Sequence, residues 1–184
     1  MIDAKLSILA KASRSNAIND LILQWMNENQ HYALLAVPVL AFLEAMVGIG
    51  LFISGAILLT VSTVLYSQEI ATLWQILPLA FVFAALSDHV GFYLGRYLGP
   101  RFHHSKFAER YATKVAKTER FILDYGSAAV ILGRLLTAVR SLVPMFIGIS
   151  GMNRLTFTIF DLIACFIWAS GLGLLVVGLD NLFN

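Results

Sequence analysis

The sequence predicts an all-α membrane protein, a helical bundle that contains two re-entrant hairpins. Hydrophobic residues make up 59% of the chain and charged residues only 13%, whereas soluble domains carry about 25% charged residues. Two apolar stretches, 31–66 and 121–154, are each too long for one membrane span and too short for two. The third observation is a set of charged residues in apolar surroundings, namely Glu44, Asp88, Arg134, Arg140 and Asp161.

Length and composition also narrow the classes of function. The 184 residues suffice for one bundle of about four to six membrane segments. No basic patch is interleaved with stacking aromatics, so we expect no nucleic-acid partner. The single Cys165 lies in an apolar stretch, which argues against a disulfide framework or a thiolate metal site. We expect no metal and no cofactor. We also expect no enzyme activity, because no Ser–His or His–carboxylate set has catalytic spacing.

The N-terminal region, residues 1–30, lacks the continuous apolar core of a signal peptide. Its apolar residues instead recur at the spacing of one helical face. The region is therefore predicted to be an amphipathic helix on the membrane surface, ahead of a single transmembrane domain over 31–184. A helix packed on the end of the bundle is an equal alternative. The apolar face consists of Ile18, Leu21, Ile22 and Trp25.

The first apolar stretch has Glu44 as its only charge. An isolated carboxylate at membrane depth costs about 2.5–3.5 kcal/mol, so Glu44 must face protein, water or a partner. We predict a re-entrant hairpin over about 32–54 and a true span over about 52–67, because broken backbone at membrane depth must be buried or line a cavity. The predicted helix breakers are Pro38, Gly48, Gly50 and Gly55.

A clean span is predicted over about 70–95. Its second half spaces small residues four apart, which lets another backbone approach closely, and we favour packing over ligand contact for this stripe. His89, beside Asp88, is interpreted as a hydrogen-bonded structural histidine rather than a proton carrier. The stripe consists of Ser87, Gly91, Gly95 and Gly99.

The segment 96–120 is strongly basic, with seven Lys or Arg residues against two acids. By the positive-inside rule it is cytoplasmic. Phe107, Tyr111 and Val115 recur every four residues, which predicts an amphipathic helix at the interface. The basic side chains serve either to determine topology or to attract anionic lipid head groups.

The second half of the chain resembles the first. A second hairpin region is predicted over 121–154 and a final span over about 155–180, interrupted only by Asp161. A shift of 96 residues superposes 40–59 on 136–155, with six of twenty positions identical, and aligns Glu44 with Arg140. We therefore expect an internal repeat, inverted in the membrane, with a site at the repeat interface. The expected breakers are Gly133, Pro144, Gly148 and Gly151.

The charged residues suit phosphate binding and proton exchange. Arg134 and Arg140 are six residues apart and would point about 120° away from each other on one helix, so both reach one ligand only if the backbone breaks between them. The planar guanidinium donates paired hydrogen bonds to phosphate. Burial favours the protonated form of Glu44 and Asp88, whereas a nearby Arg favours the carboxylate. Protonation would then release an Arg to hold a lipid phosphate. The alternative is a static ion pair that orients the hairpins.

At these residues the chain resembles the DedA family, also called SNARE-associated or VTT-domain proteins, over about 30–175. The resemblance rests on FLE at 42–44, SD at 87–88 before GFYLGRYLG, GR at 133–134 with Arg140 and Pro144, and SGM at 150–152 with Phe157 and Trp168. It implies two opposed hairpins in a helical bundle of the bacterial inner membrane. It also implies transport of phospholipids or polyprenyl phosphates driven by the proton motive force. The family's essential residues carry over onto Glu44, Asp88, Arg134 and Arg140.

Three positions depart from the family pattern. Ala56 stands where the first hairpin usually has an acid, and Thr137 stands where Pro usually separates the arginines. Asp161 stands where Asn is more common, and it is a candidate replacement for the missing acid.

The leading hypothesis is a proton-coupled lipid transporter, or flippase, with Arg134 and Arg140 on the substrate phosphate. Glu44, Asp88 and Asp161 would exchange protons. The glycines and Pro144 would shape and pack the hairpins. The alternatives are a proton-coupled small-ion transporter and a non-transporting membrane scaffold. The lipid, the direction of movement and a homo-oligomeric state stay open.

Overall fold

A computed structural model describes residues 30–99, 110, 112–135 and 140–183. Every regular element in this part of the chain is helical, so the predicted all-α class is confirmed. The predicted surface helix lies outside the described residues, except for Gln30. Residues 100–109 and 111 of the basic segment lie outside them too.

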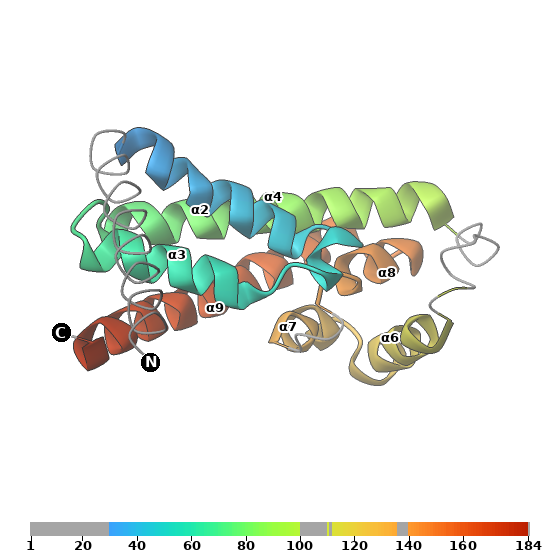
Figure 1. The fold of residues 1–184 in the computed structure, drawn as a ribbon. Coiled ribbons are helices and arrows are strands. Elements are labelled where there is room, and N and C mark those ends of the chain that lie inside the picture. Colours follow the sequence, from blue (N-terminus) through green and yellow to red (C-terminus); the bar gives the residue numbers. More distant parts are fainter. Residues whose placement is uncertain (1–29, 100–109, 111, 136–139, 184) are drawn as a thin grey trace, which may run out of the picture.

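The first apolar stretch folds into two antiparallel helices joined by a short turn (Figure 1). The elements are α2 (Gln30–Ala45), the 3-10 turn η1 (Ile49–Leu51) and α3 (Gly55–Ser67). Pro38 was expected to break the chain but lies inside α2. The chain turns instead at Gly48, whose φ of 82° is a left-handed conformation that favours glycine. At 13 residues, α3 is about 20 Å long and shorter than a full span of about 20 residues.

Helix α4 (Leu73–Leu98) is the central element and packs against α2, α8 and α9. It begins with a capping box in which Gln75 accepts a hydrogen bond from the backbone N–H of Thr72. The Ser87 hydroxyl, at the start of the small-residue stripe, donates to the Phe42 carbonyl over 2.8 Å. This bond ties α4 to α2.

The described part of the second half contains four helices, with α6, α7 and α8 gathered at the end of the bundle where α4 finishes (Figure 1). The helices are α6 (Ala112–Tyr125), α7 (Ala128–Leu135), α8 (Val143–Ile149) and α9 (Arg154–Phe183). Among the described residues, α4 and α9 are the two helices long and apolar enough to cross a membrane.

The small residues of α4 bring the α8 backbone into direct contact. A Cβ atom on Gly95 would collide with the Met145 carbonyl, and one on Gly148 would collide with the Phe92 carbonyl. A Cβ on Gly91 would press on the Val47 side chain, next to the first turn. The stripe therefore packs α4 against both halves of the molecule.

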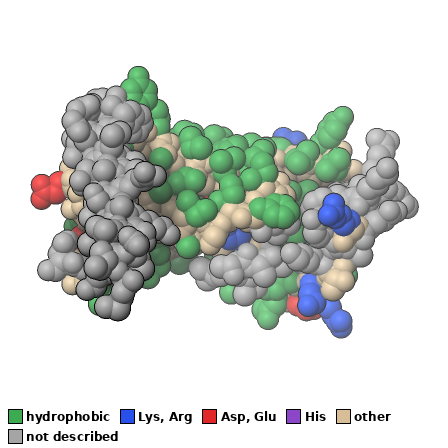
Figure 2. Space-filling model, in the orientation of Figure 1, with side chains coloured by type: hydrophobic (Ala, Val, Ile, Leu, Met, Phe, Trp, Pro, Cys, Tyr) green, Lys and Arg blue, Asp and Glu red, His purple; other side chains and the backbone are tan. Residues whose placement is uncertain are grey.

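Much of the described surface is apolar. Figure 2 shows hydrophobic side chains across the middle of the visible face and charged side chains mostly toward its ends. Large residues such as Trp74, Tyr97, Leu123 and Leu174 are mostly exposed. A continuous apolar surface of this kind marks contact with lipid or another protein.

Candidate functional site

The five predicted charges meet where the two halves of the chain approach each other. Glu44 lies in the last turn of α2, and Arg140 lies shortly before α8. The Arg140 Nη2 atom is 2.7 Å from Glu44 Oε1. Glu44 is only 2% exposed, while the Arg140 side chain is 12% exposed. The carboxylate is thus buried, and its partner reaches the edge of the protein.

Two glycines leave room for the Glu44 carboxylate. A Cβ atom on Gly55 would collide with Glu44 Oε1, and one on Gly50 would collide with the Glu44 carbonyl. Gly50 lies in the turn between α2 and α3, and Gly55 is the first residue of α3. The position of the acid therefore depends on the small size of these residues.

A second ion pair lies deeper, between Arg134 at the end of α7 and Asp88 on α4. Asp161 of α9 is 4.0 Å from the same Arg134 nitrogen. All three side chains are buried. Within the described part of the chain, Arg134 Nε and Nη2 have no hydrogen-bond partner. One guanidinium therefore serves two carboxylates and retains unused donors.

The arrangement around Arg134 also bears on metal binding. Donor atoms of Asp88, Asp161 and Cys165 lie within 4.8 Å of one another. The Arg134 guanidinium contacts Asp88 and lies near Asp161, so an arginine supplies the positive charge here. Carboxylates already paired with a cation are poor ligands for a second one.

Trp168 of α9 connects the two ion pairs. The Arg134 guanidinium carbon is 5.2 Å from the Trp168 ring centroid, and that of Arg140 is 5.6 Å away. Both distances are in the cation–π range. Trp168 contributes to the family resemblance in the sequence but was not predicted to be a site residue. Its place seven residues after Asp161, on the same face of a helix, was the available signal.

The two ion pairs differ in access. Glu44 and Arg140 line a groove of about 710 Å³ whose other walls are largely apolar, with Phe52, Ile167 and Leu175 among them. The space beside Asp88 and Arg134 is about 10 Å³, enough for about one water. Another groove of about 510 Å³, between α4 and α9, has no charged side chain in its lining and lies apart from this site.

The remaining predicted residues lie around this center. Arg134 ends one helix and Arg140 precedes the next, so they do not share a continuous helix, as expected. Thr137, between them, is outside the described residues. Pro144 lies in the first turn of α8, facing Gly91. Gly151, with a φ of 79°, turns the chain between α8 and α9.

His89 has the hydrogen bonds expected of it. Its Nδ1 atom is 2.8 Å from the Ala85 carbonyl, and its Nε2 atom is 3.1 Å from the Thr158 hydroxyl. The Nδ1 atom is also 3.3 Å from Asp161 Oδ2. His89 therefore adjoins the deeper ion pair, a contact that the sequence analysis did not predict.

The apolar surface, the long apolar helices and the buried ion pairs define the class of helical membrane proteins. Comparison with protein families matches the VTT domain to residues 52–177, more than half of the chain. The chain belongs to this family, the DedA family, and the resemblance noted in the sequence is confirmed.

Individual relatives are distant. The chain is 24% identical to inner membrane protein YabI of Escherichia coli over 80% of its own length and 58% of the relative. It is 26% identical to an uncharacterized membrane protein of Buchnera aphidicola, over 74% of the chain and 54% of the relative. The chain thus spans a little more than half the length of these two relatives. It is also 28% identical to the uncharacterized membrane protein YbfM of Bacillus subtilis, over 69% of the chain and 80% of the relative. No solved structure matches the chain significantly.

Proposed function

We propose that this protein moves a phosphate-bearing lipid, a phospholipid or a polyprenyl phosphate, across the bacterial inner membrane. The observation that carries the proposal is the Glu44–Arg140 pair, which lines a groove with largely apolar walls. A lipid needs both environments, a polar one for its head group and an apolar one for its chains. The groove offers them side by side.

Arg140 is the residue that we assign to the phosphate. Its side chain is partly exposed at the groove and holds Glu44 through one nitrogen, Nη2. A guanidinium has five N–H donors, so donors remain for a phosphate oxygen. Glu44 Oε2 is buried without a hydrogen-bond partner in the described part of the chain. The pair is therefore incompletely satisfied, which suits a ligand that completes it. Arg134 would influence the bound phosphate indirectly, through its contact with Trp168, which also contacts Arg140.

The proposed arrangement in the membrane is a pair of opposed re-entrant hairpins, α2–α3 and α7–α8. The shortness of these helices supports it, because within the described residues none of them is long enough to span a bilayer. A shift of 96 residues moves the region of α2, η1 and α3 onto that of α7, α8 and the start of α9. This correspondence supports an inverted repeat. We further propose that the basic segment 96–120 faces the cytoplasm.

Proton coupling is proposed to act through the carboxylates. When Glu44, Asp88 or Asp161 takes up a proton, its attraction for the neighboring guanidinium falls, and the arginine becomes available to phosphate. When the proton leaves, the ion pair reforms and the head group is released. We propose binding and movement only, without a chemical step, and therefore no enzyme activity.

The test is lipid movement in proteoliposomes. Purified protein would be reconstituted with a fluorescent phospholipid or a fluorescent polyprenyl phosphate, and quencher-accessible lipid would be followed with and without a pH gradient. We expect wild-type protein to move lipid, Arg140→Ala to lose movement and Glu44→Gln to lose its response to the gradient. Arg120→Ala is the matched control, because Arg120 is exposed on α6, away from the groove.

Two outcomes would favor the other functions. Proton-dependent flux of small ions without lipid movement would indicate an ion transporter. No flux of either kind, with the variants merely unstable, would indicate a scaffold in which the ion pairs hold the helices together.

A further inference from the structure

The buried charges of the site do not balance. Within the described part of the chain, Glu44, Asp88 and Asp161 face two guanidinium groups, those of Arg134 and Arg140. One negative charge is left over when His89 is neutral. An uncompensated charge in a low-dielectric interior is costly, and a site of this kind takes up a proton to neutralize itself.

The excess charge belongs to Asp161. Glu44 has Arg140 at 2.7 Å, and Asp88 is in direct contact with Arg134. Asp161 shares Arg134 at 4.0 Å and is 2% exposed. Its Oδ2 atom has no hydrogen-bond partner in the described residues. Asp161 is thus the carboxylate without an arginine of its own.

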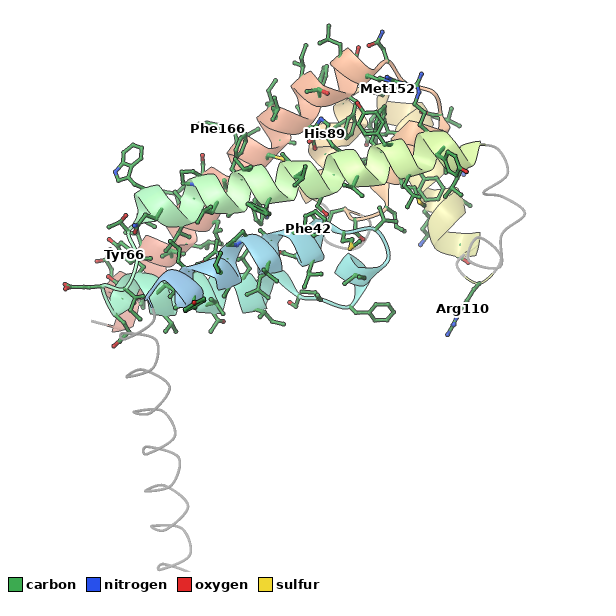
Figure 3. All side chains as sticks on the ribbon, turned by 90° about the horizontal axis from the view of Figure 1, so that it is seen from above. Phe42, Tyr66, His89, Arg110, Met152 and Phe166 are labelled. Atoms are coloured by element: carbon green, nitrogen blue, oxygen red, sulfur yellow. The ribbon has the colours of Figure 1, made fainter. Side chains whose placement is uncertain are left out.

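His89 is the protonatable side chain nearest to that oxygen. Its Nδ1 atom is 3.3 Å from Asp161 Oδ2, and its side chain is 24% exposed. Its other nitrogen contacts Thr158, and Phe157 packs edge-on against the ring. Figure 3 shows His89 between α4 and α9, toward the end where α9 begins. The Nδ1 edge of the imidazole thus meets the buried acid, and part of the ring is exposed.

His89 also lies toward the basic end of the bundle. Arg96 follows it by seven residues on the same helix, which is about 10 Å along the axis. Arg96 donates to the Met152 carbonyl over 2.8 Å, and Arg154 lies over the Tyr93 ring. These cations mark the polar end of the two long helices. A proton from that end needs to travel about two helical turns to reach His89.

We propose that His89 and Asp161 form the proton-carrying pair of this protein, with the proton entering through His89. The Nδ1–H of the protonated imidazole, which lies 2.8 Å from the Ala85 carbonyl and 3.3 Å from Asp161 Oδ2, supplies the missing positive charge beside the carboxylate. Transfer of that proton to Asp161 then leaves a neutral imidazole and a neutral carboxyl group. The other groups that face the pair are Asp88 on α4, Arg134 on α7 and Cys165 on α9.

The proton would act on the groove through Arg134. Neutral Asp161 no longer attracts Arg134, which is then held by Asp88 alone. Arg134 and Arg140 share the Trp168 ring, so a shift of one guanidinium alters the environment of the other. This inference rests on the proposed transport function and assigns the entry of the coupling proton to one residue pair.

The test compares His89→Gln with wild type in the proteoliposome assay described above. Glutamine can still hydrogen-bond Thr158 but cannot carry a proton. We expect His89→Gln to move fluorescent phospholipid as wild type does without a gradient, and to lose the acceleration caused by the gradient. Thr158→Val is the matched control, because it removes a hydrogen bond of His89 and leaves the ionizable pair intact. It should keep the acceleration.

A second measurement keeps the two proposals separable. The titration of the His89 imidazole would be followed by NMR in detergent, in wild type and in Asp161→Asn. We expect its midpoint to differ between the two proteins, whether or not any lipid moves. Retained acceleration in His89→Gln, or identical titrations, would overturn the inference and leave the transport proposal standing. A wild type that moves no lipid would overturn the transport proposal alone.

Discussion

The two ion pairs use the same chemistry in opposite settings. The Glu44–Arg140 pair has one carboxylate for one guanidinium and borders a groove of about 710 Å³. The Arg134 cluster has two carboxylates for one guanidinium and adjoins a space of about 10 Å³. The charges of the Glu44–Arg140 pair balance, and the pair borders a groove. The charges of the Arg134 cluster do not balance, and the cluster has almost no free space beside it.

This difference in access indicates which ion pair contributes more to stability and which contributes more to ligand binding. A buried charge that loses its partner cannot recover solvation, so the closed cluster should dominate stability. A pair at a groove can exchange its partner for a ligand, so the accessible pair should dominate binding.

The largest effect on stability is expected from Asp88→Ala. It leaves Arg134 buried with Asp161 as its remaining described counter-ion, at 4.0 Å. Loss of one partner of a buried ion pair costs about 3–5 kcal/mol. Thermal unfolding in detergent, followed by size-exclusion chromatography, would measure the loss.

The double variant Asp88→Ala/Arg134→Ala serves as its control. Removing both charges also removes the unpaired one, so part of the lost stability should return. If Asp88→Ala alone were as stable as wild type, the Arg134 cluster would be solvated. The two ion pairs would then not differ in their access to solvent.

The second prediction compares a glycine at the α4–α8 contact with a glycine beside the Glu44 carboxylate. In Gly95→Ala the new methyl group meets the Met145 backbone, whereas in Gly55→Ala it meets the flexible end of the Glu44 side chain. Forcing a methyl group against backbone costs about 1–3 kcal/mol. We expect Gly95→Ala to lower the melting temperature and Gly55→Ala to impair lipid movement with a smaller loss of stability.

The matched control for both is Gly178→Ala in α9, where a Cβ meets nothing within 4 Å and the residue does not line the groove. There the helix should gain about 0.5–1 kcal/mol, because alanine restricts the unfolded chain. Equal losses in Gly95→Ala and Gly55→Ala would contradict the assignment of packing to one region and binding to the other.

The sequence predicted which charges would be buried but not how they pair. Glu44 is the only charge in a 36-residue run, which was enough to infer burial, and its side chain is 2% exposed. Its pairing with Arg140 and that of Asp88 with Arg134 depend on contacts between distant segments. The His89–Asp161 contact joins α4 to α9 in the same way. Local patterns do not determine such contacts.

Helix boundaries were predictable only in part. The long apolar runs of α4 and α9 were found to within a few residues, because composition alone defines them. The first hairpin was harder, since several breakers competed within one run. Pro38 is accommodated inside α2, and Gly48 makes the turn. Hydropathy does not rank such breakers, because the packing of neighboring helices decides between them.

The third effect concerns the link between the pairs. Trp168→Leu removes the ring that lies near both guanidinium groups. A desolvated cation–π contact is worth about 2 kcal/mol and an exposed one about 0.5–1 kcal/mol. The Arg134 contact should account for most of the loss. Chemical denaturation of the detergent-solubilized protein would measure it, and Trp168→Phe, which keeps an aromatic face, should lose less.

If Trp168→Phe and Trp168→Leu are equally destabilized, the ring acts by volume alone. The link between the two pairs would then have no electrostatic component. The Arg134 cluster would still be assigned to stability and the Glu44–Arg140 pair to binding, but the proposal that Trp168 transmits changes from one pair to the other would be wrong.

The smallest effect on stability is expected from Glu44→Gln. The amide oxygen can still accept a hydrogen bond from Arg140, and the Arg140 side chain is 12% exposed at the groove, against 7% for Arg134. Its charge can therefore be solvated by whatever fills the groove, and the expected loss is about 1 kcal/mol, the size of one hydrogen bond. Asp88→Asn, the equivalent change in the closed cluster, should lose several times more by the same thermal unfolding measurement. Equal losses would mean that accessibility does not distinguish the two pairs. A small loss with altered binding of a phosphate-bearing lipid would identify the Glu44–Arg140 pair as the one that exchanges its partner.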